Sequence, residues 1–169
     1  YRGTFTDTKN RTYKEYKQGY SPWKTVPYSN SNIHGAGCGP VSLAIIANGY
    51  GINENPETIA KYMVGNTGAE KLSDALTNFL KLTNTIHWND YKNKMKENLE
   101  AGRPVVLSVK NSPTNMFTNA SHIMAGLSIN ENDEVWVSNP NSGKTNGWVP
   151  IDKIVEHIDG YFITIDSDK

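Results

Sequence analysis

The sequence predicts an α+β domain whose N-terminal half is helical and whose C-terminal half forms an antiparallel sheet. Between residues 39 and 101, apolar side chains recur at offsets of three and four, the period of a helix that buries one face. From residue 104 onward the chain shows short apolar runs bounded by Gly, Pro, Asn and Asp, which is typical of strands and turns. Helices followed by such strands indicate an α+β fold, and 169 residues suit one compact domain or two very small ones.

The first predicted helix covers residues 39–48 and lies in the middle of the domain. Its apolar run 41–47 is almost continuous, and a helix that is apolar on nearly all sides is buried on all sides. Pro40 suits a first helical turn, and Gly49 and Gly51 follow as a stop.

Three shorter helices are expected after this one. Asn55 and Pro56 form the start of the second helix, because Asn is a good cap and Pro is tolerated in a first turn. The spacing of apolar residues predicts a third helix over 70–81 and a fourth over 90–101, with Gly102 beyond its end.

The second half of the chain is predicted to be a sheet. Its expected strands cover residues 104–109, 122–129, 134–139, 148–151 and 160–165. Residues 130–133 (NEND) suit a hairpin loop between two of these strands, and residues 111–120 and 140–146 are longer polar loops.

Residues 1–22 are predicted to be an N-terminal arm or linker, and residues 23–169 the domain itself. No helical or strand period persists in the arm, where aromatic side chains are scattered among Lys, Thr and Ser. Residues 1–24 hold six Lys/Arg and two Asp/Glu, so this stretch is positive and the remainder is equally negative. Two interpretations stay open: the aromatic side chains pack on the domain, or the arm is a basic patch for an anionic polymer such as a cell-wall glycan or teichoic acid.

Composition argues against several function classes. The 17 Lys+Arg balance 17 Asp+Glu, which argues against binding nucleic acid or a membrane surface through bulk charge. No apolar run reaches the about 18 residues of a membrane span. One cysteine excludes an intrachain disulfide and a multi-cysteine zinc site, and we expect no metal and no cofactor. Because the chain begins at Tyr1 and not at Met, we expect a leader or an upstream domain before it.

Cys38 is the candidate nucleophile. It stands among glycines directly before the buried helix, where unpaired backbone N–H groups and the positive end of the helix dipole favour a thiolate. The flanking Gly37 allows a substrate backbone to approach closely and is a candidate binding residue. The alternative is a structural cysteine, since free cysteines are among the most buried residues.

His122 and Asn139 are the candidate partners of this thiol. If residues 130–133 form the hairpin loop, His122 at the start of one strand lies opposite the end of the next, where Asn139 is the polar residue. An amide oxygen there could accept the imidazole N–H and orient the ring as a base. The alternatives are an ordinary strand histidine and an Asn-Pro turn former.

These residues stand in blocks that resemble papain-like cysteine peptidases of the double-glycine leader peptidase type. The blocks, in the order of the family, are WKTVPY (23–28), GAGCGPVSLA (35–44), HIMAGL (122–127) and VWVSNPNS (135–142). The resemblance covers about residues 23–165. It implies a papain-like fold in which the nucleophile lies on a central buried helix of the N-terminal half.

The resemblance also implies roles for individual residues. Cys38 would be the nucleophile, His122 the base, and Asn139 the residue that orients the imidazole. Papain-like enzymes place an oxyanion-binding Gln about six residues before the cysteine, and this sequence has Asn32 there. Many members carry Asp where this chain has Asn139. Trp148 is a candidate substrate-binding residue in the cleft wall, and so is Trp88, although both could equally pack in the core.

The blocks are similar to catalytic modules of cell-wall hydrolases from Gram-positive bacteria, their phages and conjugative elements. This likeness implies a secreted or cell-wall-associated monomer, or part of a multidomain hydrolase, that cleaves stem or cross-bridge peptides of peptidoglycan. Two alternatives stay open. One is a cysteine peptidase or acyltransferase acting on proteins or leader peptides. The other is a non-catalytic binding module with the same fold, which the absence of the oxyanion Gln suggests.

Overall fold

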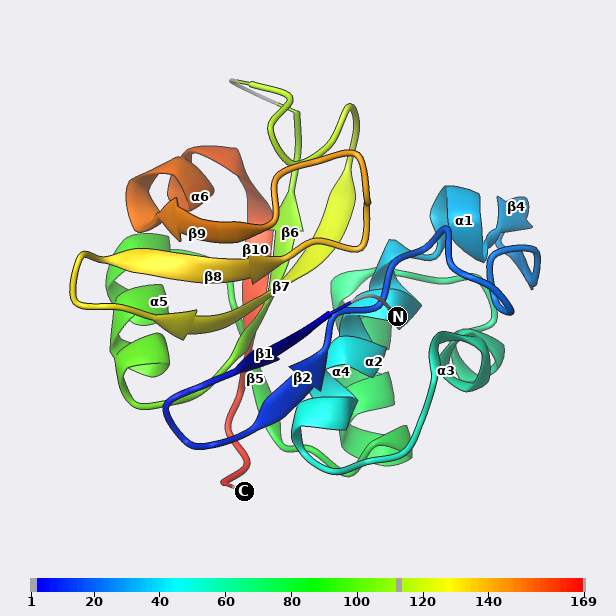
Figure 1. The fold of residues 1–169 in the computed structure, drawn as a ribbon, viewed down its shortest axis with the longest axis horizontal. Helices are drawn as coiled ribbons and strands as arrows, with labels where there is room; N and C mark the ends of the chain where they lie inside the picture. The colour runs from blue at the N-terminus through cyan, green and yellow to red at the C-terminus, as the bar shows by residue number, and fades with distance from the viewer. Residues whose placement is uncertain (1–2, 112–113, 169) are drawn as a thin grey trace.

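The computed structural model describes residues 3–111 and 114–168, and it has the predicted α+β architecture (Figure 1). A six-stranded sheet has the order β5-β10-β6-β7-β8-β9, and every neighbouring pair is antiparallel. Its strands are β5 (Asn84–His87), β6 (Val105–Val109), β7 (His122–Ile129), β8 (Glu134–Ser138), β9 (Gly147–Pro150) and β10 (Ile158–Ile165).

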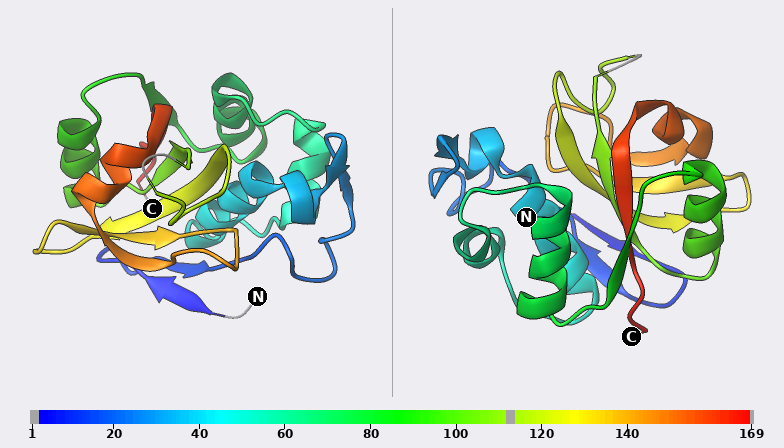
Figure 2. Two further views of the ribbon diagram at one scale, coloured as in Figure 1. Left: turned by 90° about the horizontal axis from the view of Figure 1, so that it is seen from above. Right: turned by 180° about the vertical axis from the view of Figure 1, so that it is seen from behind.

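Helices cover both faces of this sheet (Figure 2). They are α1 (Ile33–Ala36), α2 (Cys38–Gly49), α3 (Pro56–Met63), α4 (Ala69–Asp74), α5 (Tyr91–Glu100) and α6 (Ile151–His157). The alternation of strand side chains produces two cores. In β7, for example, Ile123 and Ala125 pack toward α2, while Met124 packs toward α5 and α6.

The buried helix is confirmed, and α2 begins one residue earlier than expected, at Cys38. Its side chains from Val41 to Ala47 are fully buried. Gly49 is its last residue, and it must be glycine because a Cβ there would lie 2.1 Å from the Tyr13 ring. Gly51 follows with a φ of +74°, a value that favours glycine.

The helix expected over 70–81 differs in form. It begins as α4 and continues as a π-helical segment, η1 (Ala75–Phe79), which ends before Lys81 at a φ of +61°. Apolar spacing does not distinguish these two windings, because it reports only which side of the helix is buried.

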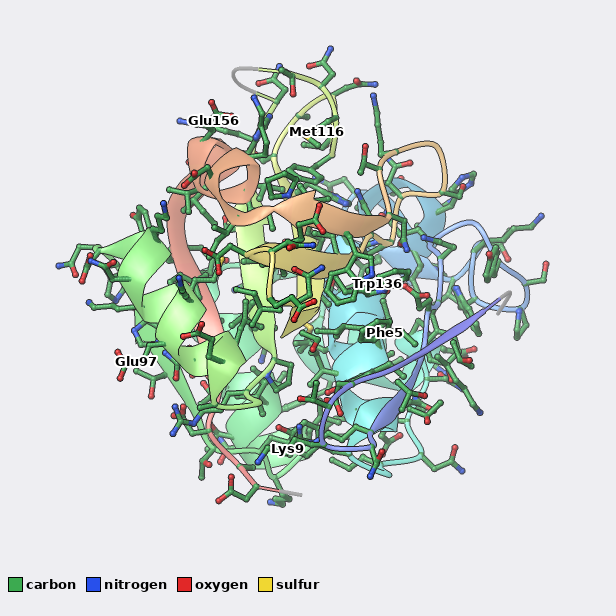
Figure 3. The ribbon with its side chains drawn as sticks, turned by 60° about the vertical axis from the view of Figure 1, so that its left-hand side comes forward. Phe5, Lys9, Glu97, Met116, Trp136 and Glu156 are labelled. Carbon is green, nitrogen blue, oxygen red and sulfur yellow. The ribbon has the colours of Figure 1, made fainter. Side chains whose placement is uncertain are left out.

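The N-terminal segment contains strands that were not predicted. β1 (Thr4–Thr6) and β2 (Thr12–Lys14) form a hairpin, and the short pair β3 (Pro27–Tyr28) and β4 (Ser31–Asn32) precedes α1. These strands are two or three residues long, too short for a period to show in the sequence. The described part of the arm packs its aromatic side chains on the domain: Phe5 stacks on Trp136 of β8 (Figure 3). The boundary at residue 22 stays a prediction.

Elsewhere the strands and loops follow the expected order. The loop 130–133 joins β7 to β8 as predicted, and β10 begins two residues before the expected start. The sequence analysis does not predict β5 and α6. The strand expected over 148–151 is β9, which ends one residue earlier because α6 begins at Ile151. Residues 112 and 113 of the predicted loop 111–120 lie outside the described residues. No helix within 3–111 and 114–168 is long and apolar enough to cross a membrane.

Candidate active site

Cys38 and His122 line one cavity of about 460 Å³ where α2 and β7 both begin. Its walls come from the segment before α2, from the loop before β7 and from the turn after β8. Many lining side chains are small and polar, and no Lys, Arg, Asp or Glu is among the described residues that form the wall. The cavity therefore offers hydrogen bonds and close backbone approach but no fixed counter-charge.

Cys38 is a half-buried residue at the first position of α2. The first N–H groups of a helix have no intrahelical acceptor, so those of Cys38 and Gly39 can stabilise a negative charge at the start of α2, whereas Pro40 has no N–H at all. Burial raises the pKa of the thiol, and the backbone N–H groups of Ile123, Gly39 and Cys38 act in the opposite direction.

Contact between α2 and β7 aligns the cysteine with the histidine. Cys38 and Ser42 are one turn apart and lie on the same face of α2. The backbone of Ile123, the residue after His122, serves both. Its N–H lowers the pKa of Cys38, and its carbonyl accepts a 3.2 Å hydrogen bond from Ser42 Oγ. The helix and the strand that carry the two groups are therefore held in register beside the cavity.

Replacing Ser42 by alanine is expected to lower the free energy of unfolding by about 1–3 kcal/mol, because the buried carbonyl of Ile123 loses its side-chain donor. Ser138 provides a matched control, since both serine side chains are fully buried. Ser138 Oγ has no hydrogen-bond partner among the residues that the structure describes, so Ser138→Ala is expected to be neutral or stabilising. Urea unfolding of both variants checks this pair, and equal effects would contradict the assigned role of Ser42.

Asn139 joins His122 through a short hydrogen bond. Ala125 of β7 pairs directly with Ser138 of β8, which is within the register that the hairpin loop predicts. Asn139 itself lies just beyond the end of β8, is fully buried, and brings Oδ1 to 2.7 Å from His122 Nε2.

Neighbouring groups determine which atom of this pair donates. Asn139 Nδ2 donates to the carbonyls of Phe117 (3.1 Å) and Thr145 (3.3 Å), and Oδ1 accepts the backbone N–H of Asn141 (3.0 Å). The amide orientation follows from these three contacts, so Oδ1 is an acceptor and His122 Nε2 must donate to it. In the neutral imidazole, Nδ1 then holds the lone pair that a base requires.

Electrostatics at rest favour an uncharged pair. Burial lowers the pKa of His122, and the hydrogen bond to Asn139 opposes this shift. Burial also raises the pKa of Cys38, so both shifts favour the thiol and the neutral imidazole over the thiolate and the imidazolium, and the titrations of the two groups are coupled.

The other predicted site residues lie outside the cavity wall. Asn32 caps α1, where its Oδ1 accepts the N–H of Gly35 at 2.9 Å. Gly37 separates α1 from α2, and a Cβ there would lie 2.7 Å from the backbone of Ile33, so packing alone accounts for the glycine.

The two tryptophans also lie away from the cavity. Trp148 on β9 is 42% exposed and packs edge-on against Phe5 and Trp136. Trp88 is 56% exposed beside Tyr161. The structure thus brings together Cys38, His122 and Asn139, and of the predicted oxyanion and substrate-binding residues only Gly37, which precedes Cys38, is adjacent to them in the chain.

Residues 118–121 and 140–142 line the cavity on the β7 and β8 side, and most of them belong to the loop 111–120 and the turn 141–147, which the sequence predicts to flank the cleft. Gln18 and His34 line it on the α1 side and were not predicted as wall residues. Gln18 Nε2 donates to the carbonyls of Ile33 (3.2 Å) and His34 (3.1 Å). No periodicity marks Gln18 in the sequence, because it lies in an irregular segment 20 residues before the nucleophile. In the described part of the chain, no group of three or more His, Cys, Asp or Glu residues is placed to hold a metal ion.

The α+β fold, and a cavity lined by both a cysteine and a histidine, are features of a cysteine peptidase domain. The model of the Peptidase C39-like family matches residues 23–163. The chain therefore belongs to the Peptidase C39-like family, and this membership supports a cysteine peptidase activity. No curated protein matches the sequence significantly.

Solved structures share this fold at low sequence identity. A protein described as a C39-like peptidase from Bacillus anthracis is 14% identical, with a TM-score of 0.66 and 99% of both chains covered. The peptidase domain of Streptococcus ComA is 15% identical, with a TM-score of 0.63 over 83% of this chain and 97% of that one. The C39-like domain of a toxin secretion ATP-binding protein from Vibrio parahaemolyticus is 16% identical, with a TM-score of 0.52 over 77% and 97%.

Proposed function

We propose that this protein is a cysteine peptidase that cleaves amide bonds with Cys38 as nucleophile, His122 as base and Asn139 as the residue that orients the imidazole. The observation that carries the proposal is the 2.7 Å contact between His122 Nε2 and Asn139 Oδ1, with His122 on the same cavity as Cys38. A nucleophile, a base and an orienting group in this relation are the requirements of thiol acyl transfer.

The reaction follows from the donor assignment. His122 Nδ1 takes the Sγ proton as the sulfur attacks the substrate carbonyl carbon, and the imidazolium then gives that proton to the leaving amine. The acyl group remains on Cys38 as a thioester. A water molecule, deprotonated by His122, attacks the thioester and releases the carboxylic acid and the free thiol.

The developing oxyanion needs donors. The backbone N–H groups of Cys38 and Gly39 at the start of α2 have no intrahelical acceptor and suit this role. The prediction that Asn32 contributes a side-chain donor stays a prediction, and the position of Asn32 as the cap of α1 does not favour it. Gln18 lies in the cavity wall, but both Nε2 protons are donated to backbone carbonyls.

We propose stem or cross-bridge peptides of peptidoglycan as substrates, which places the protein outside the cell or at the cell wall. A cavity with mostly small, polar walls suits peptides with small side chains beside the cleaved bond, because the described residues that line it include no Lys, Arg, Asp or Glu that would select for a charged one.

Digestion of purified peptidoglycan tests the substrate. The expected result is a time-dependent rise in free amino groups, with mass spectrometry locating each cleavage at a peptide bond and not in the glycan. An unstructured protein and synthetic double-glycine peptides are assayed in parallel. Cleavage of these alone would replace the peptidoglycan proposal by the alternative of a protein or leader-peptide peptidase, and no cleavage of any substrate would favour the binding module.

A further inference from the structure

The backbone of Asn139 lies where the sheet no longer supports it. The β7–β8 ladder extends to the pair of Ala125 with Ser138, and Asn139 follows Ser138 beyond the end of β8. A residue that must aim a buried amide at an imidazole needs its backbone held, because a small displacement of a positioned group costs much of its effect.

Two side chains replace the missing strand partner. The N–H of Asn139 donates to Asn146 Oδ1 at 2.8 Å, and its carbonyl accepts from Lys17 Nζ at 2.6 Å. Lys17 Nζ also donates to Asn146 Oδ1 at 2.8 Å, so one ammonium group links both supports. The next carbonyl, that of Pro140, accepts the backbone N–H of Gln18 at 2.9 Å.

Glu15 completes the cluster from the same N-terminal segment. Its Oε2 accepts from Asn146 Nδ2 and from Trp136 Nε1, each at 3.0 Å, and the residue is 8% exposed. Burial lowers the pKa of Lys17, and the carboxylate of Glu15 opposes that shift and favours the charged ammonium. A charged donor makes a stronger hydrogen bond than a neutral one.

The segment is itself anchored to the helical half of the domain. Tyr13 is fully buried against α2, and its hydroxyl donates to Asp7 at 2.7 Å. At the other end, Gln18 holds the carbonyls of Ile33 and His34 just before Cys38. Residues 15–18 therefore connect the segment that precedes the nucleophile to the residue that orients the base.

We propose that Lys17, assisted by Glu15, is a positioning residue of the active site that acts through the backbone of Asn139. This inference rests on the proposed function. It assigns a role in the site to a segment that precedes residue 23, where the family match begins.

The test is the rate of Cys38 alkylation by iodoacetamide between pH 5 and 10, followed by mass spectrometry, in Lys17→Met. A Cys–His pair alkylates below the pH at which an ordinary thiol ionises, about 8.5. We expect Lys17→Met to lower this low-pH rate about tenfold, which corresponds to the free energy of one lost charge-assisted hydrogen bond. The rise in rate near pH 9, where an ordinary thiol ionises, should remain. Lys17→Arg is expected to retain most of the low-pH rate.

Lys24→Met is the matched control, since Lys24 is an exposed lysine seven residues further along the chain and should leave the profile unchanged. A folded Lys17→Met protein with the wild-type profile would overturn the inference. If circular dichroism shows that Lys17→Met does not fold, Asn146→Ala decides, with the same outcomes, because the exposed Asn146 accepts both from the N–H of Asn139 and from Lys17 Nζ, and its loss disrupts the same cluster. Failure of the proposed function itself is distinguishable: His122→Ala would then leave the profile of the wild-type protein unchanged.

Discussion

Replacing Cys38 by alanine is expected to abolish hydrolysis, lowering kcat by at least about ten-thousandfold, because removing a nucleophile eliminates the covalent route altogether. Cys38→Ser is expected to lose nearly as much, since a hydroxyl is far less acidic than a thiol and burial lowers the pKa of the base His122. Release of free amino groups from the best substrate found, measured for both variants, checks this expectation.

The free energy of unfolding of Cys38→Ala distinguishes loss of the chemical step from loss of the fold. Cys38 is a small, half-buried residue, so Cys38→Ala is expected to change the free energy of unfolding by less than about 1.5 kcal/mol. A Cys38→Ala protein that still hydrolyses at a wild-type rate would exclude thiol catalysis.

Asn139→Asp is expected to lower the free energy of unfolding by about 3 kcal/mol at neutral pH, although related proteins with Asp at this position are expected from the resemblance. The carboxylate would keep the contacts of Oδ1 with His122 and with the N–H of Asn141. Its second oxygen, however, would face the carbonyls of Phe117 and Thr145, which the Asn139 amide satisfies with its two protons. The site is therefore built for an amide.

Asn141→Asp is the matched control for this change. Asn141 Oδ1 accepts the N–H of Gly143 at 3.1 Å, and a carboxylate accepts the same bond, so we expect a change within about 0.5 kcal/mol. Denaturant unfolding compares the two variants. Equal stability of Asn139→Asp and Asn141→Asp would contradict the donor assignment at Asn139 and, with it, the tautomer of His122.

The catalytic candidates could be predicted because local patterns carry them. Glycines and a buried helix mark Cys38, and the hairpin loop 130–133 places the start of one strand near the end of the next. This argument brings Asn139 to His122 without any knowledge of the three-dimensional fold. Their catalytic roles remain a proposal.

The supporting residues could not be predicted, because their contacts join segments far apart in the sequence. Lys17 is 122 residues from Asn139, and Glu15 is 131 residues from Asn146. No period links such positions, and β1 and β2 are too short to show one. Trp148 is expected in the cleft wall, whereas in the structure it packs on Phe5, a contact that no local pattern in the sequence indicates.

The most direct test of the Cys–His pair is the pH dependence of Cys38 alkylation by iodoacetamide in the wild-type protein and in His122→Ala. Because the titrations of thiol and imidazole are coupled, the wild-type rate should rise as the protonated pair loses its first proton. Burial lowers the pKa of His122, so this rise should occur below the ordinary histidine value of about 6.5 and then reach a plateau. In His122→Ala the plateau should vanish, and the alkylation rate should rise only where a thiol of ordinary or elevated pKa ionises. Identical profiles in both proteins, rising only above about pH 8.5, would contradict the pair.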